Sequence, residues 1–422
     1  MSRISQIDTF RAFRNRNYAL FFSGQSLSQI GTWMQRTGVS WVVYSTTHSA
    51  FMLGLTMFAS QFPSFLLSLY GGIISDRYNR YKILLFTQAA SMVQAILLAI
   101  LTLSGHYTIS GIIMLSVFLG IINAFDVPAR QPLVHEMVHD KADLPNALAL
   151  NSSMVNFAKL IGPALSGIVL QKFGAGICFS INAISFVAVI CSLLWMKLPE
   201  YKIQPSGKKL FTELSEGFTY IKETPTISSV ILMLTSASLL VLPYDTLIPV
   251  FAKTVFNGDV RTFGYISSFI GVGALVGTIF LASLKKGIDL KRILFINTIV
   301  LGIGLLLFSR ITYFPVAMAC AVLCGFGAMS QTTICITIVQ IHTASHMRGR
   351  VMSFIALGFF GMMPLGSLLI GTISQQTGAP TAILCQGILA IVIAIIFSGK
   401  LKKNKLPPKA NVNPEETITE QL

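Results

Sequence analysis

Three ionisable residues interrupt the long apolar stretches of this 422-residue chain: Arg36, Lys159 and Asp245. Lys159, in the stretch FAKLIGPALSG, follows about 13 residues of an expected helix and would lie roughly 20 Å along it. A lysine near the middle of a bilayer costs about 2.5–3.5 kcal/mol on insertion scales, so it should face water or an opposite charge. We expect Lys159 to attract an anion or to take part in proton transfer. The alternative is that it only pairs with a carbonyl or an acid between two helices.

A second pattern suggests metal chemistry. Residues 135–139 read HEMVH, which matches the zinc-protease pattern HExxH, with two histidine ligands and a glutamate base on one helix face. No histidine or acid that could complete such a site follows about twenty residues later. A membrane metalloprotease is therefore a remote alternative. No GxxxxGK phosphate loop is present either, so we expect no enzyme, no metal and no cofactor.

The composition indicates the surroundings of these residues. The chain is 53% hydrophobic and only 11% charged, whereas a soluble protein has about 25% charged residues. Apolar runs of about 20 residues are long enough to cross a bilayer. The sequence predicts an all-α polytopic membrane protein with twelve spans, at residues 18–44, 50–74, 82–104, 109–127, 146–171, 176–197, 227–252, 262–284, 291–309, 314–336, 350–374 and 380–399.

These spans form two groups of six, which we expect to be two helical bundles, at residues 18–197 and 227–399. Residues 1–17 would precede the first bundle, and residues 198–226 would be a polar linker between the bundles. The tail, residues 400–422, is polar and proline-containing, which is typical of disorder.

The basic residues predict the orientation in the membrane. Lysines and arginines gather in the segments that lie on the same side as the N-terminus, which is typical of the cytoplasmic side. Both termini and the linker should therefore be cytoplasmic. The net charge of +15 is spread over these loops, so no compact basic domain is available to bind nucleic acid. The segments predicted to lie outside hold only Lys172, Lys253, Arg261 and Arg310.

Polar helix faces predict a central cavity and a gate. Arg36 and Asp245 each lie about 18 residues from the start of their spans, near the outer leaflet. We hypothesise that they form an extracellular gate pair, which protonation of Asp245 would weaken. The alternative is an interfacial charge pair without a mechanistic role. The other candidate cavity residues are polar groups on expected inner faces, namely Gln25, Gln29, Asn156, Tyr244 and Gln331.

The chain also contains an internal repeat with an offset of 204 residues. Gly162 matches Gly366, and Gly167 matches Gly371. Gln171, Gly174 and Ala175 likewise match Gln375, Gly378 and Ala379. Small residues set how closely helices approach in lipid, so matched glycines predict matched packing. Two six-helix halves related by an axis along the membrane normal are typical of transporters.

The loop GGIISDRYNRYKIL, residues 71–84, resembles the signature loop of the major facilitator superfamily. Asn79 stands where that family usually has glycine, which is a mild departure because asparagine also tolerates a left-handed turn. By this resemblance, Asp76 would pair across to the other half at the cytoplasmic face. The residues that match the pattern are Gly72, Asp76, Arg77, Arg80 and Lys82.

The stretch AKLIGPALSG resembles the antiporter signature of the same superfamily, with Ala158 and Ser166 where glycine is usual. Its matching residues are Ala158, Gly162, Pro163, Ser166 and Gly167. AFDVPARQPL and MRGRVMS look like the enterobactin-exporter-like branch, also called the transmembrane secretion effector family. With the signature loop they would form a cytoplasmic gate, to which they contribute Asp126, Arg130, Arg348 and Arg350.

The resemblance covers nearly the whole chain. It implies a monomeric, proton-coupled exporter of siderophores or drugs in a bacterial-type inner membrane, which works by alternating access. Its partners would be protons, the lipid bilayer and a small-molecule substrate, which Lys159 and Arg36 predict to be anionic or zwitterionic. The main alternative is a polyspecific multidrug efflux antiporter. A sensor that binds without transport is a further one.

Overall fold

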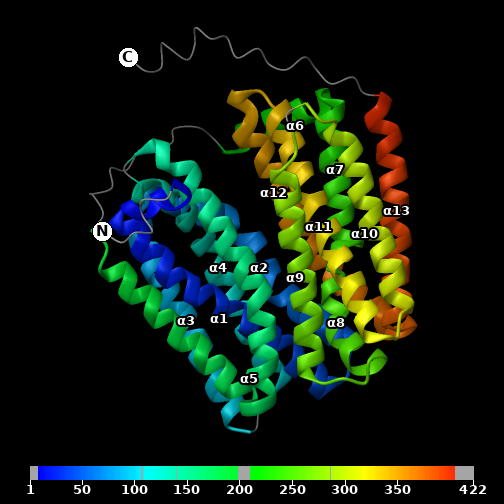
Figure 1. The fold of residues 1–422 in the computed structure, drawn as a ribbon. Helices are drawn as coiled ribbons and strands as arrows, with labels where there is room; N and C mark the ends of the chain where they lie inside the picture. Colours follow the sequence, from blue (N-terminus) through cyan, green and yellow to red (C-terminus); the bar gives the residue numbers. More distant parts are fainter. Residues whose placement is uncertain (1–7, 106–107, 139, 198–209, 286, 404–422) are drawn as a thin grey trace.

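The computed structural model describes residues 8–105, 108–138, 140–197, 210–285 and 287–403, and every regular element among them is a helix. Figure 1 shows two side-by-side helical bundles. The first bundle contains α1 (Arg16–Thr47), α2 (Ala50–Arg77), α3 (Arg80–Leu103), α4 (Ile109–Met137) and α5 (Leu144–Leu194). The second contains α7 (Pro225–Leu240), α9 (Val260–Ala282), α10 (Leu290–Arg310), α11 (Phe314–His342), α12 (Arg348–Thr377) and α13 (Ala379–Lys403).

The described helices account for the twelve predicted membrane crossings. Ten helical segments of the described chain are long and apolar enough to cross a membrane. One of them, α5, has 51 residues and changes direction at Gly174, where φ is 80° and ψ is 175°. Only glycine adopts that backbone conformation without strain, so α5 supplies two crossings. The twelfth is α1, whose 32 residues include many buried polar groups.

The predicted span 227–252 lies within one segment long and apolar enough to cross a membrane, Pro225–Val255, but its helix is interrupted. The α-helical part, α7, ends at Leu240, and the chain continues through the 3₁₀ turn η4 (Leu242–Leu247), α8 (Ile248–Val250) and the π turn η5 (Phe251–Val255). Pro243 and Pro249 lie in this region. Proline has no N–H to donate, so it cannot continue a regular helical hydrogen-bond ladder.

Two segments at the predicted bundle boundaries also contain helix. The linker contains an amphipathic helix, α6 (Leu210–Glu223), between residues outside the described part and Pro225. The last helix, α13, continues to Lys403, so the first four residues of the predicted tail are helical. Residues 404–422 lie outside the described residues.

The bundles meet along two pairs of helices, α2 with α12 and α5 with α9. In Figure 1 α6 and the C-terminal end of α13 lie at the top, and the bundles converge toward the bottom. We call these the α6 end and the far end. The close backbone contacts between bundles involve the start of α2 and the end of α12. For example, a Cβ atom on Gly54 would lie 2.4 Å from the Ser367 carbonyl oxygen.

The glycines of the repeat make equivalent contacts in the two halves. Gly162 packs on α1, where an added Cβ would lie 2.5 Å from Cβ of Trp33; Gly366 packs on α7, 2.2 Å from the Leu239 carbonyl oxygen. Gly167 packs on α9 and Gly371 packs on α2, so both face the opposite bundle. The predicted pseudo-symmetry of the bundles is therefore confirmed at the level of helix packing.

Candidate functional site

A cavity lies between the bundles, with about 960 Å³ of space that includes its open part. Its walls come from α1, α2 and α5 of the first bundle and from η4, α9, α11 and α12 of the second. Because both halves contribute, any motion of one bundle against the other changes its shape. Apolar side chains form much of the wall, including Met57, Phe263, Ile270, Met329, Phe359 and Met363.

The three ionisable residues singled out in the sequence all line this cavity. The Arg36 guanidinium Nη2 lies 3.8 Å from Asp245 Oδ2, and the two side chains are 35% and 38% exposed. Lys159 is close enough to interact electrostatically with both. Two cations and one carboxylate leave an excess of one positive charge, which favours an anion in the cavity.

Trp33 connects the two cations, and the sequence analysis missed it. The Arg36 Cζ atom lies 5.1 Å from the centroid of the Trp33 ring, and Lys159 Nζ lies 5.8 Å from it. These distances suit cation–π attraction, which offsets part of the repulsion between the two positive charges. Trp33 precedes Arg36 by three residues and shares its helix face, so this spacing could have identified it.

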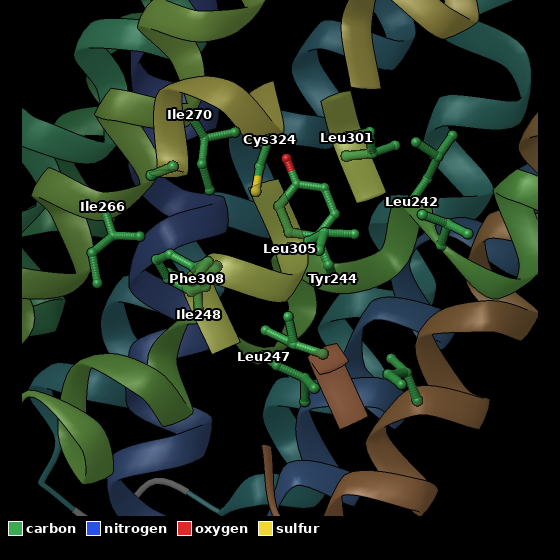
Figure 2. Packing of buried hydrophobic residues seen from close by; sticks show 14 of the residues in the cluster. Leu242, Tyr244, Leu247, Ile248, Ile266, Ile270, Leu301, Leu305, Phe308 and Cys324 are labelled. Carbon is green, nitrogen blue, oxygen red and sulfur yellow. The ribbon is translucent and has the colours of Figure 1, made fainter. Parts of the chain in front are cut away.

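The broken seventh span positions Asp245 and Tyr244. Both lie in η4, where the irregular backbone lines the cavity. Transporter sites are often formed by such interrupted helices. Figure 2 shows the Tyr244 ring held among apolar neighbours that include Leu242, Leu305 and Cys324. Tyr244 is only 4% exposed, so it contributes a fixed polar group to a mostly apolar wall.

The other polar residues predicted for the cavity do not line it. Gln25 is 2% exposed and its Oε1 has no hydrogen-bond partner in the described chain. Gln29 and Asn156 are half-buried elsewhere on α1 and α5. Gln331 is fully buried within the second bundle. The four residues that face the cavity on α11 are instead Gly325, Ala328, Met329 and Thr332.

The antiporter-like stretch mainly brings helices together. The Ser166 hydroxyl donates a hydrogen bond to the Met34 carbonyl of α1 at 3.0 Å, and Gly167 packs on α9. Ala158 is 1% exposed, and Pro163 lines the cavity. This close packing orients Lys159 toward the cavity.

The signature loop joins helices of the first bundle in this structure. Arg80 donates to Asp76 at 3.3 Å and to Glu136 at 2.8 Å, which links α2, α3 and α4. Asp76 is 61% exposed, and Gly72 has no neighbour where a Cβ would lie. Arg77 is exposed. The carboxylate of Asp76 thus has its partner within its own bundle.

Apart from Arg348, the remaining residues predicted for a cytoplasmic gate bond, among the described residues, to groups of their own half. Asp126 is buried inside the first bundle and forms an ion pair with Arg130 on α4. Arg350 forms an ion pair with Glu216 of α6, within the second half of the chain. Arg348 is exposed. The ion pairs of Asp126 and Arg350 in the described part of the chain thus stay within one half.

Only part of the HEMVH segment belongs to the described residues. Glu136 is held by Arg80, and His139 lies outside the described residues. Within the described chain, no group of three or more His, Cys, Asp or Glu residues could hold a metal ion.

Two pseudo-symmetric bundles of six spans, with a charged cavity between them, define a secondary transporter of the major facilitator superfamily. The chain belongs to the transmembrane secretion effector family, whose profile matches residues 7–422.

Relatives with high coverage are transporters. The staphyloferrin A transporter of Staphylococcus aureus (strain NCTC 8325 / PS 47) is 29% identical over 92% of this chain and 96% of its own length. The enterobactin exporter EntS of Salmonella choleraesuis (strain SC-B67) is 22% identical over 96% of both chains. Macrolide efflux protein A of Streptococcus pyogenes is 21% identical over 89% of this chain and 93% of its own. The family and these relatives identify the protein as a transporter and not an enzyme.

Solved structures share the fold. A POT family transporter in complex with 5-aminolevulinic acid has a TM-score of 0.75 and 14% identity, and the match covers 92% of this chain and 97% of that one. A bacterial homologue of the lysosomal transporter Spinster, in an inward-facing and unoccupied conformation, has a TM-score of 0.72 and 12% identity, with 93% and 99% covered.

Proposed function

We propose that this transporter exports an anionic or zwitterionic siderophore in exchange for protons, by alternating access. The observation that carries the proposal is the cluster of Arg36, Lys159 and Asp245 in the cavity between the bundles. Its excess positive charge lies within apolar walls, where the effective dielectric constant is lower than in water and attraction of an anion is stronger. Two of the relatives carry names of siderophore transporters.

The proposal includes an orientation in the membrane. The distribution of Lys and Arg favours a cytoplasmic α6 end, in a bacterial inner membrane. The close contacts of the bundles at the far end would then correspond to an inward-open state. We further propose that one chain is sufficient, since the cavity takes its residues from both halves of a single chain.

The Arg36–Asp245 pair suggests how transport and proton movement are coupled. It joins α1 of one bundle to η4 of the other, so its formation holds the bundles together around the cavity. An anionic substrate entering from the α6 end would compete with Asp245 for the guanidinium. A proton arriving from the far end would neutralise the carboxylate. Either event separates the pair and frees the bundles to move.

Proton release from everted vesicles tests this proposal. Vesicles with an acidic interior would receive carboxylate or catecholate siderophores one at a time, while a dye reports the internal pH. We expect siderophores to dissipate the gradient, and Lys159→Ala to raise the half-maximal concentration roughly 10- to 100-fold, because a charge-assisted contact is lost. Lys253→Ala, an exposed lysine away from the cavity, is the matched control.

Asp245→Asn separates binding from coupling. The variant should still exchange labelled for unlabelled siderophore across the membrane, but it should no longer use the pH gradient to accumulate it. If Asp245→Asn accumulates substrate as the parent does, the proposed coupling role is wrong.

A multidrug exporter is the second candidate, and the cavity walls favour it. Methionine side chains adapt to apolar ligands of different shapes, and one relative carries the name of a macrolide efflux protein. This function predicts that macrolides or lipophilic cations dissipate the gradient and that siderophores do not. Lys159→Ala would then leave transport nearly unchanged.

A further inference from the structure

At the far end, each of the two seams between the bundles finishes in a glutamine bonded to the first residues of a helix in the opposite bundle. In the seam of α5 and α9, the Gln171 Nε2 donates to Asp259 Oδ2 at 2.7 Å. In the seam of α2 and α12, the Gln375 Oε1 accepts from the Ser49 hydroxyl at 2.9 Å and from the Phe51 N–H at 3.4 Å. Asp259 and Ser49 are the N-cap residues of α9 and α2.

The two arrangements occupy matched positions of the repeat. Gln171 ends the stretch GIVLQ and Gln375 ends GTISQ, so each glutamine follows a seam glycine by four residues. Residues four apart share a helix face, so the glutamine and the glycine contact the same helix of the opposite bundle. A glutamine at the matched position thus bonds across each seam, as a donor at Gln171 and as an acceptor at Gln375.

The glycines place the glutamines within reach of their partners. A Cβ on Gly167 would lie 3.1 Å from Cα of Arg261, and a Cβ on Gly371 would lie 3.1 Å from Cα of Gly54. Such contact holds the helix backbones at a fixed separation near the far end. One turn further along, each glutamine reaches the N-cap of the neighbouring helix, where the cap residue is fixed by its own bonds.

We propose that Gln171 and Gln375 are a symmetric pair of latches that hold the far end closed, and that both bonds break each time this end opens. This inference rests on the alternating access of the proposed function, but not on its substrate or on proton coupling. The latches act as positioning residues: they set the balance between the two conformations and do not touch the cavity.

The two latches differ in chemistry, and this difference makes the proposal testable. Gln171 is a donor to a carboxylate, so a glutamate there would face Asp259 with like charge. Gln375 is an acceptor at the start of α2, where free N–H groups and the helix dipole favour a negative charge. A glutamate at position 375 therefore keeps its bond. Gln171→Lys should also keep its latch, because an ammonium donates to Asp259.

Accessibility of the cavity from the far end is the measurement. Ser267 on α9 lines the cavity, so Ser267→Cys reports its exposure to a membrane-impermeant maleimide added to right-side-out vesicles without substrate. The parent without this cysteine gives the background from the six native cysteines. We expect Gln171→Glu to raise the labelling rate roughly two- to tenfold, the effect of one lost hydrogen bond on a conformational equilibrium. Gln375→Glu and Gln171→Lys should label at the parent rate.

Gln171→Leu with Gln375→Leu removes both bonds and should give the fastest labelling. Equal rates for Gln171→Glu and Gln375→Glu, or a parent-like rate for the double leucine variant, would overturn the proposal. Everted vesicles are labelled in parallel. If the protein is inserted in the opposite orientation, the results expected for right-side-out vesicles will be seen in everted ones, and the variants will keep the same ranking of labelling rates. Failure of the siderophore proposal would leave these rates unaffected.

Discussion

The helix pair α3–α4 of the first bundle and its counterpart α10–α11 of the second each bury a polar side chain. The two pairs differ in whether that side chain has hydrogen-bond partners. Both α4 and α11 have 29 residues, and aligning their ends matches Asp126 with Gln331. Asp126 Oδ1 accepts from the Thr87 hydroxyl at 2.9 Å and from the Gln88 amide at 2.7 Å, and Arg130 pairs with Oδ2. Every oxygen of this carboxylate is engaged.

Gln331 is buried to the same degree but has no such partners. Its Nε2 and Oε1 atoms both lack a hydrogen bond within the described chain, as does Asn297 Nδ2 on α10. Gly327 of α11 packs on Leu301 of α10. One helical turn from this contact, Asn297 on α10 and Gln331 on α11 therefore lie at the same level. Buried polar groups without partners cost free energy, so this part of the second bundle retains unused hydrogen-bonding capacity.

A second network strengthens the contrast. In the first bundle, Gln35 donates to Gln94 Oε1 at 3.0 Å and accepts from the Asn182 amide at 2.8 Å, which ties α1, α3 and α5 together. The second bundle instead contains the broken seventh span. Side-chain hydrogen bonds therefore hold α1, α3 and α5 of the first bundle together, whereas part of the second bundle is irregular backbone.

The largest effect that can test this contrast is expected from Asp126→Asn. The change leaves Arg130 without its carboxylate inside the first bundle and should lower stability by about 3–5 kcal/mol. Asp76→Asn is the matched control, because Asp76 also pairs with an arginine four residues on but is 61% exposed. Its loss should be below about 1 kcal/mol. Thermal inactivation in detergent measures both, and similar losses would contradict the contrast between buried and exposed pairs.

A smaller loss is expected from Gln35→Leu. The substitution nearly keeps the volume but removes the partner of both Gln94 and Asn182, which should cost about 1–2 kcal/mol. Gln29→Leu, a half-buried glutamine on the same helix, should cost less. The same thermal assay applies, and an unchanged melting temperature for Gln35→Leu would show that the network does not stabilise the first bundle.

The smallest effect, of opposite sign, is expected from Gln331→Leu. This variant removes an amide without partners and replaces it with an apolar group of similar shape, so stability should stay equal or rise by up to about 1 kcal/mol. If the variant inactivates at a lower temperature than the parent, Gln331 makes a favourable interaction and the contrast between the bundles fails.

Much of the architecture could be predicted because it depends on local composition. Apolar runs of about 20 residues cross a bilayer wherever they occur, and the glycines at an offset of 204 indicated equivalent packing, as Gly162 and Gly366 confirm. The break after Leu240 was missed, since hydrophobicity alone does not distinguish a helix from irregular backbone. Pro243 was the available signal.

The site was predicted less completely than the fold. Charge in an apolar run marks a residue as exceptional, so Arg36, Lys159 and Asp245 were identified and all line the cavity. Uncharged polar residues carry no such signal, because a glutamine can be satisfied inside a bundle as well as in a cavity. Gln25 and Gln331 are buried away from the cavity, which their residue type did not indicate, while Trp33 gains its role from two cations on different helices.

The sequence by itself determined the class of the molecule, its crossings, its internal repeat and the three charges that a membrane interior would not tolerate without compensation. These follow from solvation and from helix geometry, which depend on residues near one another in the chain. Only the tertiary structure decided which partners those residues meet. Arg36 and Asp245 are separated by more than 200 residues, and so are Ser49 and Gln375, yet each pair meets where the bundles pack, because distances between helices are set by the packing of whole helix faces and not by any single residue.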